Sequence, residues 1–413
     1  MKRQIVSLDN ISDLPRWRRP EALLFVMAFA MPVAFATWNA LLNNFVIEVA
    51  GFTGVEIGWL HTVREIPGFF AIGVIALIMI VREQVLGIVS LILLGVATAV
   101  TAMFPSLGGI LVVTMLSSIG FHYYETVNQS LQLQWLPKDR APIVLGRLVA
   151  AGSAASLIAY GLLVITWKTF DLSYNLVYLL SGGFTAIVAL FALLAYPQFE
   201  APNPQAKKLI LKRRYGLYYA LQFMAGARRQ IFVVFAAFMM VEKFGFEVHE
   251  ITALFLINFV ANMLVAPYFG KVVFRRGERF VLMFEYIGLT LVFLAYGGIY
   301  WLGWGVVVAG ALYVIDHMLF GLAFALKTYF QKIADPEDIA PTAAVAFTIN
   351  HIAAVFLPAL LGYLWVASPG GVFVLAAAMA LASLGLSALI PRHPEKGNEW
   401  RLFRRVVEAN PAE

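Results

Sequence analysis

The chain has 413 residues, of which 61% are hydrophobic and 13% are charged, and its mean hydropathy is +0.81. About a quarter of the residues in an ordinary soluble domain are charged, so this composition excludes a soluble globular protein, a disordered chain and a fibrous repeat. The formal net charge is +6, but the basic residues lie in the loops between apolar segments, so we expect no nucleic-acid partner. Because cysteine is absent, disulfides, thiolate metal sites and a thiol nucleophile are excluded.

Twelve apolar segments, each long enough to cross a bilayer as a helix, follow one another along the chain. A backbone in lipid has to satisfy its own hydrogen bonds, and these segments lack the alternation of barrel strands. The sequence therefore predicts an all-α membrane protein with twelve transmembrane helices. The predicted spans are 22–47, 55–80, 84–104, 108–133, 142–168, 174–196, 215–241, 249–274, 278–300, 304–333, 341–366 and 370–390.

The basic residues predict the orientation of these spans. If the N-terminus is inside, the outer loops contain only Lys168 and Lys243. Five further basic residues lie within spans, and all the others fall in inner loops or tails, which is the positive-inside pattern. We expect a multi-pass protein of a prokaryotic inner membrane with both termini in the cytoplasm. A signal peptide cleaved near Ala34–Ala36 is the alternative for the first span, but that span is longer than a signal core.

Two short repeats divide the chain near its midpoint. Gly51-Phe52-x-x-x-Glu56-Ile57 recurs as Gly245-Phe246-x-x-x-Glu250-Ile251, and Pro137-Lys-Asp139-Arg-Ala141-Pro142 recurs as Pro336-Glu-Asp338-Ile-Ala340-Pro341. The two offsets are nearly equal and close to half the length, which is typical of transporters built from parallel repeats. We expect an N-terminal six-helix bundle at 1–196, a basic cytoplasmic linker at 197–214, a C-terminal six-helix bundle at 215–391 and a cytoplasmic tail at 392–413.

This plan of six spans, a basic linker and six more spans resembles the major facilitator superfamily of secondary transporters. The segment from Gly270 to Arg279 is similar to the family's Gly-x-x-x-Asp-Arg-x-Gly-Arg loop, with Phe274 at the position of the acid. The resemblance implies two pseudo-symmetric bundles and a central cavity lined by spans 1, 2, 4, 5, 7, 8, 10 and 11. It assigns spans 3, 6, 9 and 12 to outer support. Among these only span 9 carries charges: Glu278 and Arg279 at its inner end, and Glu285 further within it.

Ionisable side chains inside the predicted spans mark the candidate site, because a charge in a bilayer costs about 2.5–3.5 kcal/mol and usually has a partner. In spans 2, 4 and 10 they recur at helical spacing and form stripes. The structural alternative for each is an ion pair or hydrogen bond that holds helices together. The proton-coupling candidates are Glu125, Asp316, His122, His317 and His351. The substrate-binding candidates are Arg64, Glu65, His61, Arg228, Tyr124, Asn39, Trp38, Gln129, Asn258, Tyr313 and Asn350.

These residues favour a secondary active transporter of a small polar, anionic organic solute that works by alternating access and is coupled to protons. An arginine at mid-depth suits a carboxylate or phosphate, although the sequence leaves open whether Arg228 or Arg229 faces the cavity. We expect Glu125 and Asp316 to carry protons, with the histidines as relays. The expected partners are a small-molecule substrate, protons and the lipid bilayer, and we expect a monomer without a cofactor, resident metal or enzymatic activity.

Three other functions stay open at this point. Efflux of amphipathic compounds fits the 14% aromatic content, although span 5 lacks the Gly-Pro pair of many drug antiporters. Divalent metal transport is suggested by two pairs at helical ligand spacing, His61 with Glu65 and His122 with Glu125. A non-transporting assembly or sensor protein could use the same fold. The sequence does not determine the substrate, the direction of transport, the coupling ion or the oligomeric state.

Overall fold

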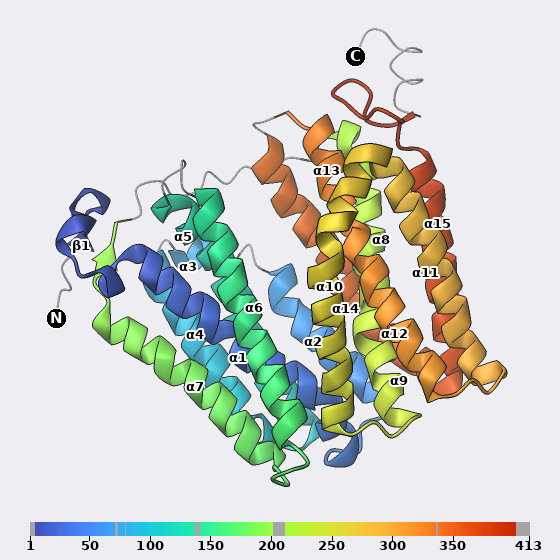
Figure 1. Ribbon diagram of the computed structural model, residues 1–413, viewed down its shortest axis with the longest axis horizontal. Helices are drawn as coiled ribbons and strands as arrows, with labels where there is room; N and C mark the ends of the chain where they lie inside the picture. Colours follow the sequence, from blue (N-terminus) through green and yellow to red (C-terminus); the bar gives the residue numbers. More distant parts are fainter. Residues whose placement is uncertain are drawn as a thin grey trace. The chain divides into compact units, whose positions relative to one another are not determined.

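The computed structural model describes residues 5–70, 73–78, 80–136, 141–200, 211–335 and 338–401. Within these ranges, eleven helical segments are long and apolar enough to cross a membrane, judged by length and composition (Figure 1). The predicted all-α membrane fold is therefore confirmed. The helices that form single spans are α1 (Pro20–Glu48), α4 (Glu83–Val100), α5 (Leu107–Trp135), α6 (Ala141–Thr166), α7 (Tyr174–Ala195), α10 (Val248–Arg276), α11 (Glu278–Trp301), α14 (Ile339–Ala367) and α15 (Pro369–Ala388).

The predicted second span, 55–80, is not one continuous helix, which corrects the sequence interpretation. It consists of α2 (Gly54–Phe69) and α3 (Gly73–Ile78), and Phe70 already lies in a turn. A helix-interior proline lacks an N–H donor, and glycine is a poor helix former, so Pro67 and Gly68 weaken the last turn of α2. α2 also carries three charged residues, which lowers its hydropathy.

Two further spans contain short irregular segments. The seventh span consists of α8 (Gly216–Gln230), a π-helical segment (Ile231–Ala236) and α9 (Ala237–Glu242). The tenth consists of α12 (Val306–Phe320), a 3₁₀ turn (Gly321–Ala323) and α13 (Phe324–Ile333). Such departures from α-geometry are frequent at functional sites. Both segments lie within five residues of an ionisable side chain of the candidate site.

The chain forms two compact units. Unit 1 comprises Met1–Gly51, Val63–Ala206 and Phe246–Ala253, and unit 2 comprises Phe52–Thr62, Lys207–Gly245 and Leu254–Glu413. Most of the range 1–196 lies in unit 1 and most of the range 215–391 lies in unit 2, with two differences from the expected bounds. The first turns of the second and eighth spans are exchanged between the units, and the expected linker at 197–214 is divided between them.

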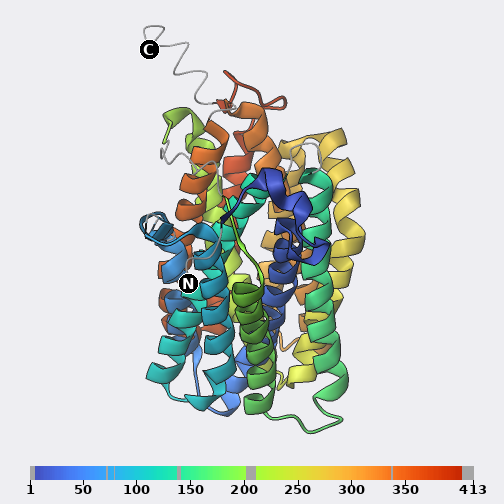
Figure 2. The same cartoon turned by 90° about the vertical axis from the view of Figure 1, so that its left-hand side faces the viewer.

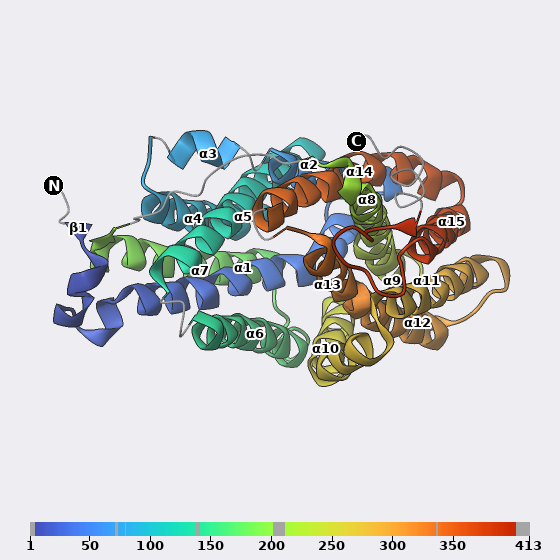
Figure 3. The same ribbon diagram turned by 90° about the horizontal axis from the view of Figure 1, so that it is seen from above.

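The helices pair in the same way within each unit. In unit 1, α4 packs against α5 and α7, and α1 packs against α6 and α7, as seen from above in Figure 3. In unit 2, α11 packs against α12 and α15, and α8 packs against α14 and α15. Counted from the start of each half, these are the same pairs of spans. This correspondence supports the parallel internal repeat that the short sequence motifs indicated.

The first of those motifs is also a repeat in structure. Gly51 and Gly245 have φ angles of +67° and +68°, a conformation that glycine adopts without steric cost. Glu56 and Glu250 then each accept a hydrogen bond from the backbone N–H three residues earlier, at 2.8 and 2.9 Å. This is the acidic half of a helix capping box. Residues 137–140 and 336–337 of the second motif lie outside the described residues.

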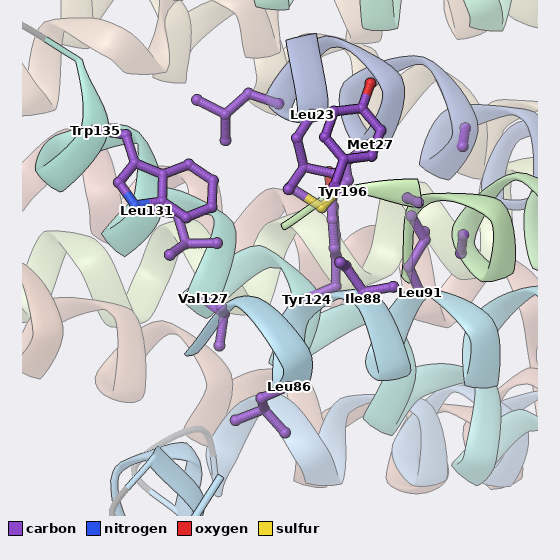
Figure 4. Close-up of a cluster of buried hydrophobic side chains, with 14 of the residues drawn as sticks. Leu23, Met27, Leu86, Ile88, Leu91, Tyr124, Val127, Leu131, Trp135 and Tyr196 are labelled. Atoms are coloured by element: carbon purple, nitrogen blue, oxygen red, sulfur yellow. The ribbon is translucent and has the colours of Figure 1, made fainter. Parts of the chain in front are cut away.

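An apolar core holds unit 1 together (Figure 4). It gathers side chains from α1, α4 and α5, including Met27, Leu91 and Val127. At one end of this unit, the strand β1 (Ile5–Val6) pairs in parallel with β2 (Gln198–Phe199), which follows α7 (Figure 2). The N-terminal segment is thereby fastened beside the end of α7.

Close helix packing in unit 2 depends on glycines of α2. A Cβ at Gly58 would overlap the carbonyl oxygen of Pro358 in α14, and a Cβ at Gly54 would overlap the ring of Trp365. This small-x-x-x-small spacing lets helix backbones approach closely. Thr62 lies one turn further along. Its hydroxyl donates to the Val355 carbonyl at 2.7 Å and accepts from the Ala359 N–H at 3.2 Å, so it is inserted into the hydrogen-bond ladder of α14 beside Pro358.

The substitution Gly58→Ala is expected to destabilise the protein. The added methyl group has no room against the α14 backbone, and such overpacking costs about 1–3 kcal/mol. The measurement is the midpoint of thermal unfolding of the purified protein in detergent. Gly161→Ala is the matched control, because Gly161 is also helical and has open space around its Cβ position. Equal midpoints for the two variants would contradict the packing argument.

A network of ion pairs fastens the connecting segments at one end of unit 2. Lys212 lies 2.7 Å from Asp338, while Asp335 lies 2.7 Å from Arg214 and 2.6 Å from Lys396. The hydrogen bond to Lys396, together with Arg214, lowers the pKa of Asp335. Burial raises the pKa of Asp338, but hydrogen bonds from Lys212 and a tyrosine outweigh it, so that pKa is also lowered. The hydrogen bond to Asp338 raises the pKa of Lys212.

The directions of these pKa shifts predict how the stabilisation of the fold by the network depends on pH. The two aspartates stabilise the fold above their unfolded pKa of 3.8, and this stabilisation is lost as pH falls through their lower folded values. Asp338→Asn should therefore lower the unfolding midpoint at neutral pH, by an amount corresponding to about 1–3 kcal/mol for a buried hydrogen-bond acceptor. The difference from the unsubstituted protein should shrink below pH 3.8. A difference that stays constant into strong acid would contradict the ionised role of Asp338.

Candidate functional site

Three ionisable side chains meet inside unit 2. Arg228 from α8 is 1% exposed, and its Nη1 lies 3.6 Å from Oε1 of Glu285 in α11, which is 0% exposed. Asp316 from α12 is also 0% exposed and is close enough to Arg228 for their charges to attract. The guanidinium of Arg228 further stacks over the Tyr286 ring at 4.4 Å. Arg228, Glu285 and Asp316 are called the unit 2 charge cluster below.

The unit 2 charge cluster combines two carboxyl groups with one guanidinium. Neither oxygen of Asp316 has a hydrogen-bond partner in the described part of the chain. A buried, unpaired charge is strongly unfavourable, so with both carboxylates ionised the cluster would carry one uncompensated negative charge. Uptake of a single proton removes that charge. The arrangement is therefore suited to bind and release a proton.

Aromatic side chains extend from this cluster. The ring of Phe232, four residues after Arg228, lies 5.0 Å from the ring of Tyr313 and 5.8 Å from that of His317. Phe320 stacks on Phe232 at 6.3 Å. Tyr313, His317 and Phe320 all belong to α12 and surround the position of Asp316 on that helix. The predicted candidates Tyr313, Asp316 and His317 are therefore brought together by the structure.

A second polar group lies inside unit 1. The guanidinium of Arg64 in α2 bonds its neighbour Glu65 through Nη2 at 2.7 Å and Nε at 3.2 Å. It also lies over the Trp38 ring of α1, at 5.9 Å. A ring nitrogen of His122 in α5 lies within 4.8 Å of a Glu65 carboxylate oxygen. Three predicted substrate-binding residues and one predicted proton relay therefore lie in one group, and carboxylate and imidazole can exchange protons or bind divalent cations.

The other candidates lie apart from these two groups or have structural partners. Asn39 is hydrogen-bonded to Tyr160, and Asn350 donates to the Gln222 carbonyl at 3.2 Å. His351 contacts the Phe347 carbonyl of its own helix at 2.8 Å. The remaining candidates differ in exposure: His61 and Asn258 are buried, Glu125 is half-buried, Gln129 is exposed, and Tyr124 lies in the apolar core of unit 1. Tyr124 therefore contributes to packing and is not carried into the proposed site.

Sequence reasoning left Glu285 out of the candidate set. The resemblance placed span 9 among the supporting helices, yet the structure turns this side chain toward Arg228. A signal was present, because beyond the first two residues of span 9 Glu285 is the one charge within the four spans assigned to support. Of the paired arginines, Arg228 is fully buried within unit 2, whereas Arg229 is half-buried.

Removing the guanidinium from the unit 2 charge cluster should lower the free energy of unfolding. In Arg228→Met, Glu285 loses its counter-ion, and breaking a buried pair in this way costs about 3–5 kcal/mol. The double variant Arg228→Met/Glu285→Leu should recover part of that loss. Thermal unfolding in detergent measures both effects, and Arg229→Met is the matched control with a smaller expected shift. If the double variant were less stable than Arg228→Met, the interpretation of the pair would be wrong.

The comparisons with known proteins agree with this architecture. The family model of the Major Facilitator Superfamily matches residues 22–358. A search of curated proteins found no match. Among solved structures, a mutant of the nucleoside transporter NupG is similar, with a TM-score of 0.73, 15% identity, and coverage of 90% of this chain and 99% of that one.

Two further solved structures have similar folds. A bacterial homologue of the human lysosomal transporter Spinster, in an inward-facing and occupied conformation, has a TM-score of 0.68 and 13% identity, and covers 89% of this chain and 95% of that one. A bacterial homologue of the iron transporter ferroportin, in an inward-facing state, has a TM-score of 0.68 and 10% identity. The match covers 91% of this chain and 99% of that one. At these identities the likeness describes the fold alone.

Proposed function

The chain belongs to the major facilitator superfamily, and we propose that this secondary transporter moves a small anionic organic solute together with protons. The observation that carries the proposal is the unit 2 charge cluster, where the unpartnered carboxyl group of Asp316 lies beside a buried arginine that already has a counter-ion in Glu285. Ionisable groups inside membrane spans are costly and mark substrate or ion pathways.

The cluster suggests how anion and proton binding are linked. A carboxylate or phosphate on the solute competes with Glu285 for Arg228, because a guanidinium can bind such groups in a bidentate manner, whereas Glu285 approaches it through one pair of atoms at 3.6 Å. A carboxylate that loses its partner in a dry site becomes neutral by taking up a proton, since the unpaired charge would cost several kcal/mol. Anion binding at Arg228 therefore favours protonation of Glu285 or Asp316. Arg228 is buried, so the solute reaches it in another state of the alternating-access cycle.

Unit 1 supplies the second part of the proposal. Glu125 stays a proton-coupling candidate on α5, with His122 one turn earlier on the same helix. Arg64 is the second candidate for attracting the anion, although its pair with Glu65 limits the positive charge that it presents. The proposal therefore assigns coupling chiefly to the unit 2 charge cluster and keeps the unit 1 group as a separate candidate for substrate binding.

Transport by reconstituted protein tests the coupling role of Asp316. A thermal-shift screen with carboxylates, phosphate esters, nucleosides, sugars, amphipathic cations and divalent metals first identifies a ligand. In proteoliposomes, Asp316→Asn should keep exchange of that ligand across the membrane but lose accumulation driven by a proton gradient. The physical reason is that an amide cannot take up the coupling proton.

Asp171→Asn is the matched control, because Asp171 is an exposed residue between α6 and α7 and the charge change is the same. If Asp316→Asn accumulates the solute under a proton gradient as well as the unsubstituted protein does, Asp316 is not a coupling residue. If no organic anion shifts the unfolding midpoint or is transported, the proposed substrate class is wrong.

The aromatic side chains favour a second candidate, a solute that carries a flat ring. Beside the charge cluster, the rings of Phe232 and Phe320 are stacked and the ring of Tyr313 is tilted by 34° to that of Phe232. Aromatic rings bind planar solutes through their faces. The fold similarity to the nucleoside transporter NupG makes nucleosides a reasonable test case. Binding of nucleosides but not of organic anions in the same screen would favour this candidate over the first.

A further inference from the structure

Three arginines converge at one end of unit 2. Arg279 stands at the start of α11, and the segment that follows α15 brings Arg392 and Arg401 close enough for their charges to repel that of Arg279. The chain turns at Gly277, just before Arg279. The φ of Gly277 is +80°, and its Cβ position lies 3.9 Å from the Arg392 carbonyl oxygen. Arg279, Arg392 and Arg401 are called the arginine cluster below.

The arginine cluster has no acidic partner in the part of the chain that the structure describes. Two acids nearby in sequence are engaged elsewhere: Glu278 lies 2.7 Å from Lys332, and Glu399 lies 3.8 Å from Arg214. The third, Glu395, is exposed and forms no ion pair with the three arginines in the described ranges. Like charges at short range are unfavourable unless an opposite charge joins them. A group of three unneutralised arginines is therefore the expected footprint of an anionic ligand.

The segment that carries two of these arginines is held in place by specific contacts. The Tyr329 hydroxyl donates to the Glu399 carbonyl at 2.7 Å, and Lys396 lies 2.6 Å from Asp335. The Arg401 N–H donates to the Leu389 carbonyl at 3.0 Å. These contacts hold Arg392 and Arg401 near Arg279 against their mutual repulsion, so the proximity is part of the fold of this segment.

Apolar side chains lie next to the arginine cluster. The Arg276 guanidinium lies 5.7 Å from the centre of the Phe280 ring, and Phe280 and Phe284 are 49% and 56% exposed. These two rings are four residues apart on α11, a helix apolar enough to cross the membrane, so they share one face. Exposed aromatic rings beside basic residues at the end of a membrane-crossing helix suit the boundary between headgroups and acyl chains.

We propose that the arginine cluster is a binding site for the headgroup of an anionic phospholipid, whose acyl chains lie along Phe280 and Phe284. Guanidinium groups bind phosphate oxygens in a bidentate manner, and basic pockets at the cytoplasmic ends of membrane helices recognise such headgroups. The positive-inside pattern assigns this end of unit 2 to the cytoplasmic leaflet. A lipid explains both the unneutralised charge and the adjacent exposed rings, whereas free phosphate would explain only the charge.

Native mass spectrometry of the delipidated full chain in neutral detergent tests this site. Phosphatidylglycerol should bind more tightly than phosphatidylcholine, and Arg279→Gln/Arg392→Gln/Arg401→Gln should weaken phosphatidylglycerol binding about tenfold to a hundredfold, since each basic residue contributes roughly 1 kcal/mol. The control Arg16→Gln/Arg82→Gln/Arg213→Gln removes the same charge from three exposed positions elsewhere and should leave the affinity within about threefold.

Other measurements separate this site from its alternatives. The triple variant of the arginine cluster should unfold at the same or a higher temperature without lipid, because its mutual repulsion is relieved. Equal phosphatidylglycerol affinity in this variant and in the unsubstituted protein would overturn the proposal. So would equal stabilisation by inorganic phosphate and by phosphatidylglycerol, which would identify a site for a free anion. If the triple variant does not fold, the single substitution Arg279→Gln provides the same comparison with a smaller expected loss of affinity.

Discussion

The cost of placing charge in a medium without water is the constraint on which the rest of this structure depends. Arg228, Glu285 and Asp316 come from three different helices of unit 2 and are almost completely buried. They are tolerated because Arg228 attracts both carboxyl groups, and their helices have to stay packed for that attraction to persist. The same requirement makes the cluster responsive, since one proton or one competing anion changes its balance of charge.

The irregular helical segments lie where this constraint acts. The π-helical turn follows Arg228 by three residues, and the 3₁₀ turn follows Asp316 by five. Each changes the rotation of the helix beyond the charged residue, and thereby the direction in which the following side chains point. Phe232 lies in the first of these segments, and it is the ring that contacts Tyr313 and His317. Local geometry thus joins the charged and aromatic parts of the candidate site.

Outside the membrane-spanning helices, charge has a different function. Among the connecting segments of unit 2, Lys212, Asp335 and Asp338 form short ion pairs that hold chain segments in place. The arginine cluster is the exception, because its charges are held together without an acidic partner in the described ranges. The contrast between these two groups, which belong to the same unit, supports an external ligand for the second. Asp338 is buried, so its partners contribute to stability, whereas the pair between Asp335 and the exposed Lys396 mainly positions the chain.

Much of the fold could be predicted from the sequence because lipid restricts the choices. Long apolar segments in a bilayer have to be helices, so eleven of the twelve spans follow from hydropathy, and the repeat at Gly51 and Gly245 predicts two equivalent halves. The exception is the segment 55–80, where the charges of α2 lower the hydropathy and the helix ends at Phe69, just after Pro67 and Gly68. The sequence also identified Arg228 and Asp316, since ionisable residues are conspicuous within apolar segments.

The contact partners of these side chains, in contrast, were decided by tertiary structure. Periodicity gives the face of a helix on which a residue lies, but not the helix that this face meets or the rotation between them. Glu285 as the counter-ion of Arg228, Tyr124 in the core and Thr62 within the ladder of α14 therefore could not be derived from spacing. The sequence determined which residues are unfavourable to bury in this protein. Only the packing of the helices decided which of those residues contact and neutralise one another.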